Sequence, residues 1–375
     1  MKILHLIDTF DARFERDQIK LVELLETKRY RNVVITSRFS SDWRVTKKAE
    51  FMNWEKRFSQ TEIVHAPCLR VPTPFSKLPL SIYLPSRQIL QGFHIIHAYS
   101  FGSFSSFLGA VLKKMRNLGF VVRSDLSQAI YCKARKAPFY RMLVTYPFRV
   151  ADAVYAYSNL EKRLLVDLGV QESRIWIIPA GIDFGKFSKQ PTIQRKANIT
   201  IGYLGRFCFV KGVHRVIPAL QKLLRGEKEI KVVFTGIIED AEYAKSVIDA
   251  LREFGNFEYL GDLSISPTRF YDMCDIVLIP SVSETGAITV LEAMASGKVV
   301  IASDINPIKE YIQNGRTGFL FSEENDLYAC LKKLIESPHL VTEIGERARK
   351  KAEEYDWQHL IRKYEAMYRS VMKRK

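Results

Sequence analysis

The chain has 375 residues, 47% hydrophobic and 26% charged; this is typical of globular proteins, and the length predicts two α/β domains rather than one core. No stretch of about 18 residues is apolar throughout, which excludes the usual pattern of a membrane-spanning helix. The five cysteines never stand in a Cys-x-x-Cys spacing, which argues against a disulfide framework and a structural zinc site.

The net charge of +16 is concentrated in residues 43–149, which hold 17 lysines and arginines against 4 acidic residues. A positive field of this size attracts an acidic partner, such as an anionic membrane, a phosphorylated lipid or a nucleic acid. A solvated basic surface without a dedicated partner is the alternative. No nucleic-acid-binding motif accompanies the charge, so we do not expect nucleic acid to be the partner.

In the first half of the chain, short apolar runs alternate with amphipathic stretches, as in parallel sheets with crossover helices. The first ten residues, MKILHLIDTF, have too short an apolar part for a signal peptide and predict a buried strand. The run 71–85 contains four prolines and predicts a loop. The expected strands are 3–7, 32–36, 62–65, 94–97, 120–123, 153–157 and 174–178, and the expected helices are 16–25, 104–118, 141–151 and 159–168.

A domain boundary is expected near residue 180, because the stretch 185–197 is polar and without periodicity. A second α/β set follows, with strands expected at 200–204, 231–235, 257–260, 275–279 and 299–302 and helices at 213–224, 241–254, 267–273 and 287–296. The tail predicts three helices, at 325–335, 340–353 and 357–373. The predicted domains are therefore 1–180 and 181–355, followed by a final helix within 356–375.

The first candidate site segment is GRFCFVKG, residues 205–212, between an expected strand and an expected helix. This position is the carboxyl end of a parallel strand, where open α/β sheets bind ligands. Arg206 offers a planar fork for phosphate oxygens, and Lys211 adds a movable point charge. The segment suits a diphosphate, with a solvated basic loop as the alternative.

The second candidate segment is PSVSETGAITVLEAMASG, residues 280–297, which follows the next buried strand. A helix N-terminus near Gly286 places free N–H groups and a positive dipole at the same edge of the sheet. Glu284 precedes this terminus, where a carboxylate accepts hydrogen bonds from sugar hydroxyls, and Glu292 suits a ribose diol. The alternatives are an N-terminal charge cap for Glu284 and a solvent-facing helix residue for Glu292.

These segments resemble the signature of glycosyltransferase family 4, also called glycosyl transferases group 1. Gly205-Arg206 with Lys211-Gly212 is similar to its GRxxxxKG loop, and Glu284 and Glu292 match its EX7E motif. Further resemblances, in order along the chain, are 179–187 (PAGIDFGKF), 259–261 (YLG), 314–319 (NGRTGF) and 355–357 (YDW). The resemblance implies a GT-B fold, with two Rossmann-like parallel-sheet domains facing a cleft and a C-terminal helix that crosses back to the N-terminal domain.

The resemblance also implies a set of residue roles. Arg206 and Lys211 would hold and stabilise the departing diphosphate, Glu284 would bind donor-sugar hydroxyls, and Glu292 would bind the ribose. The remaining expected donor-binding residues are Gly205, Gly261, Leu263, Thr285, Gly286, Ala287 and Ile288. The family's metal-independent habit agrees with the absence of an Asp-x-Asp motif, so no metal or other cofactor is expected.

The N-terminal half departs from the family pattern. The loop after the first strand is Asp8-Thr9-Phe10-Asp11-Ala12-Arg13 rather than a glycine pair. Where relatives often have a histidine after the fifth strand, the chain has Arg123-Ser124-Asp125, and either Asp125 or Arg123 is expected to take that place near the reacting sugar. His97 matches a family histidine, and both a catalytic and a structural role remain open for it.

We therefore predict a retaining hexosyltransferase that moves a sugar from a UDP-, GDP- or ADP-linked donor to a glycan or a lipid-phosphate-linked acceptor. A nucleotide-sugar epimerase, a phosphorylase and a non-catalytic partner subunit are the alternatives. We expect a cytoplasmic location, including the inner membrane face through the basic block 43–149. Aromatic residues interleaved with cations suggest the contact, unless they pack on the domain instead: Trp43, Phe51, Trp54 and Phe58 with Arg44, Lys47, Lys48, Lys56 and Arg57.

Overall fold

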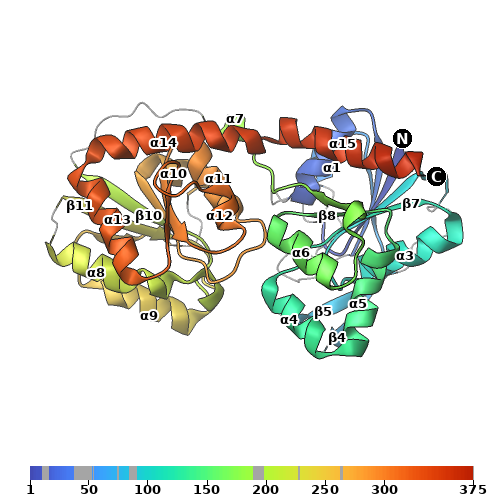
Figure 1. The fold of residues 1–375 in the computed structure, drawn as a ribbon, viewed down its shortest axis with the longest axis horizontal. Helices are drawn as coiled ribbons and strands as arrows, with labels where there is room; N and C mark the ends of the chain where they lie inside the picture. The colour runs from blue at the N-terminus through green and yellow to red at the C-terminus, as the bar shows by residue number, and fades with distance from the viewer. Residues whose placement is uncertain are drawn as a thin grey trace. The chain divides into compact units, whose positions relative to one another are not determined.

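The computed structural model describes residues 1–10, 17–37, 53, 55–73, 76–83, 91–188, 198–226, 229–261 and 265–374. The chain divides into two compact units, shown in Figure 1. The first comprises Met1–Pro179 together with Leu360–Lys375, and the second comprises Ala180–His359. Each unit contains a parallel β-sheet with helices packed on it, which confirms the predicted α/β class.

The first unit is built on a sheet of seven parallel strands in the order β3-β2-β1-β6-β7-β8-β9. Its strands are β1 (Lys2–Ile7), β2 (Arg31–Thr36), β3 (Glu62–His65), β6 (Ile95–Ala98), β7 (Gly119–Arg123), β8 (Ala153–Ala156) and β9 (Ile175–Ile177). Its helices are α1 (Asp17–Thr27), α3 (Phe104–Arg116), α4 (Gln128–Lys136), α5 (Pro138–Val150) and α6 (Asn159–Asp167). The central strands are buried at every residue, which explains their nearly continuous apolar sequence.

The last helix, α15 (Trp357–Lys373), contributes its final turns to the first unit. Tyr364, Met367, Tyr368 and Val371 are fully or almost fully buried there. The Tyr30 hydroxyl donates to Glu365 at 3.2 Å, and Val371 packs so closely on Gly119 that a Cβ at that glycine would lie 2.7 Å from it. The core of the first unit therefore includes side chains of a helix from the far end of the chain.

The first half differs from the prediction in two places. Residues 71–85 were expected to be a loop, whereas β4 (Cys68–Thr73) and β5 (Ser76–Tyr83) form an antiparallel pair with a register irregularity between Val71 and Thr73. A two-stranded ribbon has only edge strands, and prolines are tolerated at edges and irregularities. Helix α4 was not predicted; it begins after Ser127, whose side chain accepts from the Ile130 N–H, and it ends next to Pro138.

The second unit is built on six parallel strands in the order β12-β11-β10-β13-β14-β15. They are β10 (Ile199–Leu204), β11 (Ile230–Thr235), β12 (Phe257–Tyr259), β13 (Ile276–Ile279), β14 (Val299–Ser303) and β15 (Phe319–Phe321). The helices are α7 (Phe184–Phe187), α8 (Ile217–Gly226), α9 (Ala241–Arg252), α10 (Pro267–Met273), α11 (Ile288–Ala295), α12 (Ile308–Tyr311), α13 (Glu324–Glu336) and α14 (Pro338–Ala352).

The helix expected at 213–224 begins later than predicted. Residues Val213–Arg215 form a short 3-10 turn, and α8 starts at Ile217 with Pro218 in its first turn. Proline has no N–H to donate and a fixed φ, so it fits the first turn of a helix and not its interior. Strand β15 and helix α12 were not predicted, because three or four residues are too few to show a period.

Among the described residues, no helix has both the length and the apolar character needed to cross a bilayer.

Candidate functional site

The loop after β10 places its two cations at the carboxyl end of the second sheet. A 3-10 turn at Phe209–Lys211 follows the strand and ends on Gly212, which has φ +67°. Lys211 is largely buried, whereas the Arg206 side chain is half exposed and forms an ion pair with Glu239. The two predicted phosphate-binding side chains therefore lie on one short loop but in different surroundings.

The loop after β13 brings Glu284 directly against Lys211. Glu284 Oε1 accepts a hydrogen bond from Lys211 Nζ at 2.5 Å and another from Ser281 Oγ at 2.7 Å. The Glu284 side chain is only 9% exposed. Because a low local dielectric strengthens such a pair, Lys211 and Glu284 form a fixed cation–carboxylate centre. The structure thus unites two residues that lie 73 positions apart in the sequence.

Three loops of this edge are in direct backbone contact through glycines. A Cβ at Gly212 would collide with the carbonyl oxygen of Pro280, and a Cβ at Gly236 would collide with the carbonyl oxygen of Gly205. The Val282 N–H also donates to the Val210 carbonyl at 2.9 Å. The loops after β10, β11 and β13 are therefore packed into one surface, and Gly212 and Gly236 permit their close approach.

Helix α11 begins beside this centre, as predicted. Its N-cap, Ala287, has φ +45°, a conformation that non-glycine residues seldom adopt. Thr285 and Gly286 precede it, and the Gly286 carbonyl accepts from the Tyr311 hydroxyl at 3.2 Å. The first N–H groups of the helix, including that of Ile288, have no partners within the helix itself. The N-cap next to Glu284 is therefore a strained position of the kind that is concentrated at functional sites.

Glu292 lies on α11, one residue before the buried Ala293, and is half-buried. Its Oε2 accepts from the hydroxyl of Tyr271 at 3.0 Å, and Tyr271 is fully buried on α10. Burial and the carboxylate together raise the pKa of Tyr271 well above its ordinary value, so the phenol stays a donor. Glu292 is therefore an oriented carboxylate and not a freely solvated one.

Two further residues of this site gave no signal in the sequence. Arg215 donates to the Pro280 carbonyl at 3.2 Å, to Ser303 Oγ at 2.6 Å and to the Ser322 carbonyl at 3.1 Å. It thereby joins the ends of β13, β14 and β15 to the loop after β10. Glu239, which pairs with Arg206, follows β11. Their partners are distant in sequence, so neither contact shows as a local pattern.

Gly261 follows β12 with φ +85°, and its carbonyl accepts from Thr235 Oγ1 at 2.8 Å and from the Gly236 N–H at 3.2 Å. Leu263, the other residue expected in the nucleotide-base region, lies outside the described residues. Within the part of the chain that the structure describes, no group of three or more histidines, cysteines and acidic residues is arranged to hold a metal ion.

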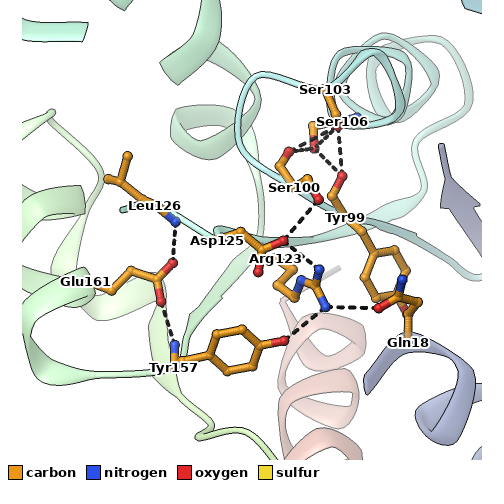
Figure 2. A network of polar contacts seen from close by, with 10 residues as sticks. All are labelled: Gln18, Tyr99, Ser100, Ser103, Ser106, Arg123, Asp125, Leu126, Tyr157 and Glu161. Atoms are coloured by element: carbon orange, nitrogen blue, oxygen red, sulfur yellow. Dashed lines mark hydrogen bonds and ion pairs between the residues drawn. The ribbon is translucent and has the colours of Figure 1, made fainter. Parts of the chain in front are cut away.

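The first unit has its own polar centre at the carboxyl end of its sheet, drawn in Figure 2. Asp125 Oδ2 accepts from Arg123 Nη2 at 2.5 Å and from Ser100 Oγ at 3.0 Å. Arg123 also donates to the Tyr157 hydroxyl at 2.9 Å and to Gln18 Oε1 at 3.3 Å. The Arg123 side chain is 11% exposed and that of Asp125 is 23% exposed, so the carboxylate is the more accessible partner.

Both Ser100 and Asp125 have a left-handed backbone, with φ +78° and +50°. Such strain in non-glycine residues is concentrated at functional sites. The two residues follow neighbouring strands, β6 and β7, and their side chains are hydrogen-bonded to each other (Figure 2). This places Asp125, rather than Arg123, at the accessible end of the network.

Glu161 closes the other side of this network in Figure 2. Its carboxylate accepts from the N–H groups of Leu126 and Tyr157, each at 2.7 Å. Burial raises the pKa of Glu161 to about 7. Burial likewise raises the pKa of Asp8, which accepts from Ser105, and that of Asp17 to about 6.

The structure places His97 in the core of the first unit, where it is 0% exposed. Its Nδ1 is 2.8 Å from the Tyr368 hydroxyl of α15 and 3.2 Å from that of Tyr99, and burial holds its pKa well below the ordinary value. A side chain without accessible surface has no contact with a substrate. The geometry of His97 therefore favours a structural role over a catalytic one.

The predicted aromatic membrane contact is corrected at Phe58. This residue is 8% exposed and packs on Phe10, with 5.5 Å between the ring centroids. Arg57 beside it is paired with Glu23 at 2.9 Å. Phe58 therefore packs on the domain, which is the alternative interpretation given above. Trp43, Phe51 and Trp54 lie outside the described residues.

Comparison with known families agrees with these motifs. The profile described as Glycosyltransferase Family 4 matches residues 19–186, and that described as Glycosyl transferases group 1 matches residues 184–351. Together they span both units. The chain belongs to glycosyltransferase family 4.

Several curated members of this family are similar over part of their length. A lipopolysaccharide 1,2-N-acetylglucosaminetransferase of Salmonella typhimurium is 28% identical over 213 residues, 50% of this chain and 55% of that protein. The capsular polysaccharide biosynthesis glycosyltransferase CapM of Staphylococcus aureus is 25% identical over 242 residues, 60% of this chain and 63% of that protein. The chain therefore spans only 55% of the length of the first of these two relatives and 63% of the length of the second.

Solved structures confirm the GT-B fold of this family 4 chain. HepE of Anabaena, crystallised with UDP and glucose, superposes with a TM-score of 0.74 at 18% identity over 99% of this chain and 100% of that one. The lipopolysaccharide outer core galactosyltransferase WaaB superposes with a TM-score of 0.69 at 17% identity over 99% of both chains.

The strand ends of the second unit bring a cation and a carboxylate together. A diphosphate held by Lys211 and a sugar held by Glu284 would lie next to each other, because the two side chains are themselves in contact. The dipole of α11 adds positive potential at the same edge. The site is thus suited to a ligand that is anionic at one end and rich in hydroxyls at the other.

Proposed function

We propose that the chain is a glycosyltransferase that moves a sugar from a nucleotide-sugar donor to a glycan or a lipid-linked acceptor, with retention of anomeric configuration and without a metal ion. The observation that carries the proposal is the 2.5 Å contact between Lys211 and Glu284, within the family's two signature loops. Its relatives in family 4 build lipopolysaccharide and capsular polysaccharide by their names, which supports a glycan or lipid-linked acceptor.

In the proposed reaction, Arg206 and Lys211 hold the diphosphate and stabilise the charge that develops on it as it leaves. Glu284 and the first N–H groups of α11 hold the sugar, and Glu292 holds the ribose diol. The acceptor oxygen bonds to the anomeric carbon as the bond from that carbon to the diphosphate breaks, and the hydroxyl proton passes to the departing diphosphate. The transition state is oxocarbenium-like.

On the acceptor side, we assign Asp125 the place of the family histidine. Its carboxylate is held by Arg123 and Ser100 and is still 23% exposed, so it is able to accept a hydrogen bond from a sugar hydroxyl. The positive field of residues 43–149 supports a cytoplasmic enzyme that works at an anionic membrane surface.

The donor is tested first by thermal shift with UDP, GDP and ADP and with their sugar conjugates, since a ligand that binds the native state raises its stability. HepE was crystallised with UDP and with UDP-glucose, so these are the first donors to test. Transfer is then measured with a radiolabelled donor and a lipid extract, with and without EDTA, and the anomer of the product is read by NMR. Acceptor-independent conversion of the donor, or an inverted product, would overturn the proposal.

A further inference from the structure

The first unit carries an exposed amphipathic surface on α5 and the end of α4. Three apolar side chains of α5 are strongly exposed: Phe139 at 74%, Met142 at 58% and Leu143 at 47%. Their spacing places them on one face of the helix. The opposite face, with Val144 and Phe148, is buried in the core. The exposed face is therefore not a packing surface of this unit.

The apolar face continues onto a neighbouring helix. Tyr146, one turn beyond Met142, lies against Phe107 of α3, with 6.2 Å between the ring centroids. Phe107 is itself 37% exposed, and the Lys114 ammonium group lies 5.4 Å from the centroid of the Tyr146 ring. Helix α5 packs on both α3 and α4 (Figure 1). The face is thus a continuous apolar strip across two helices.

Exposed cations lie at the end of α4 and at the start of α5. Lys133, Arg135 and Lys136 form the last turn of α4, Arg141 follows in the first turn of α5, and all four are exposed. Among the described residues, none of these four cations forms an ion pair with a carboxylate. The sequence contains no acidic residue between Asp125 and Asp152. We name the four cations with Phe139, Met142 and Leu143 the α4–α5 surface.

We propose that the α4–α5 surface is where this chain docks on a bilayer containing anionic lipids. Apolar side chains that project from a helix flanked by lysines and arginines match the chemistry of the headgroup boundary: the side chains enter it and the cations contact lipid phosphates. A second copy of the chain would bring like charges together, which disfavours a symmetric dimer on this face. The inference rests on the proposed use of a membrane-borne acceptor and assigns the contact to specific residues.

The test is flotation of the full chain with vesicles of phosphatidylcholine alone and with vesicles in which about one lipid in three is phosphatidylglycerol. We expect binding to the anionic vesicles that falls with salt. The variant K133E/K136E/R141E should lower the partition coefficient by at least about 100-fold, since each cation near the surface contributes about fivefold and each glutamate adds repulsion. The variant F139S/M142S/L143S should lower it as well while keeping the charge.

The matched control is K245E/R252E/K332E on α9 and α13, which changes the net charge equally and should bind vesicles more tightly than K133E/K136E/R141E. Equal loss of vesicle binding in both charge variants would overturn the proposal, and so would an unchanged partition coefficient of F139S/M142S/L143S. Failure of the wild-type chain to bind anionic vesicles would also overturn it and would point to an acidic protein partner. Thermal unfolding checks that the exposed substitutions leave the fold intact. Vesicle binding without any sugar transfer would overturn the proposed function and leave this surface standing.

Discussion

Lys211 Nζ and Glu284 Oε1 lie 2.5 Å apart, at the ends of the loops that follow β10 and β13. The contact depends on backbone packing beneath it, because Gly212 lies directly against the carbonyl of Pro280. A substituent at Gly212 would separate the two loops and with them the two side chains. The cation–carboxylate centre is therefore a property of the sheet edge and not of either loop alone.

The first prediction concerns Glu284. In Glu284→Gln, the side chain keeps its shape and an oxygen that accepts from Lys211, but it loses the charge that binds sugar hydroxyls and balances the developing cation. We expect kcat/KM to fall by about 10²–10³-fold, as for other preorganised groups of this kind. Binding of the nucleoside diphosphate alone, measured by calorimetry, should persist. Glu324→Gln, an exposed substitution on α13, should retain full activity; equal losses in both variants would exclude a specific role.

The second prediction concerns Glu239, which pairs with Arg206 where both side chains are about half exposed. In Glu239→Gln, Arg206 has no carboxylate competing with the diphosphate. An exposed pair contributes about 0–1 kcal/mol, so nucleoside diphosphate affinity should rise by up to about fivefold. Calorimetric titration measures this, with Glu242→Gln on α9 as the matched control. Weaker binding would show instead that Glu239 positions Arg206 for its ligand.

The third prediction concerns Arg215. A lysine at this position keeps the charge but cannot reach Pro280, Ser303 and Ser322 together. We expect Arg215→Lys to lower the free energy of unfolding of the second unit by about 1.5–3 kcal/mol. Urea unfolding measures the loss. Arg225→Lys at the exposed end of α8 should change stability little; if both variants behave alike, Arg215 does not join the strand ends.

The two loops of the candidate site could be predicted from the sequence because their information is local. A strand, a glycine, the cations Arg206 and Lys211, and a helix follow one another within a few residues, and the same holds for Glu284 before α11. The fold could be predicted for a similar reason, since buried parallel strands show as apolar runs. What the sequence does not contain is the pairing of Lys211 with Glu284, which arises only when β10 and β13 become neighbours.

Contacts that span the sheet could not be predicted. Arg215 reaches Ser322, 107 positions away, and nothing in its immediate neighbourhood marks it. Similarly, the strain at Ser100 and Asp125 follows from two strand ends meeting and not from either residue type. The β4–β5 pair was missed because its prolines hide the alternating pattern, although a two-stranded ribbon accommodates them.

The fourth prediction concerns Asp125. Asparagine also tolerates the left-handed backbone, so Asp125→Asn removes the charge while keeping the local conformation. If Asp125 binds the acceptor, the KM for the acceptor should rise and kcat should fall, by about tenfold or more together, while donor binding to the second unit stays unchanged. Steady-state kinetics with varied acceptor separates these effects. Glu172→Gln, exposed in the same unit, is the control, and an unchanged acceptor KM would contradict the assignment.

The fifth prediction concerns pH. Burial raises the pKa of Glu161 to about 7 from the ordinary 4.5, so the folded state holds a proton that the unfolded state has released between these values. The stabilisation is fully present below pH 4.5 and is lost as the pH rises to 7, by on the order of 3 kcal/mol. Asp8 and Asp17, raised to about 6, act in the same direction.

Glu161→Gln mimics the protonated acid. In this variant the free energy of unfolding should therefore fall less steeply with pH, by about the slope that one bound proton produces. Urea unfolding between pH 5 and 8, about the range where the group titrates, measures the slope for the wild type and the variant. Glu172→Gln should keep the wild-type slope, since the hydrogen bond from Lys162 and its charge lower the pKa of that exposed carboxyl, which is therefore ionised throughout this range. Identical slopes for wild type and Glu161→Gln would show that Glu161 is already ionised in the folded protein, held by the N–H groups of Leu126 and Tyr157.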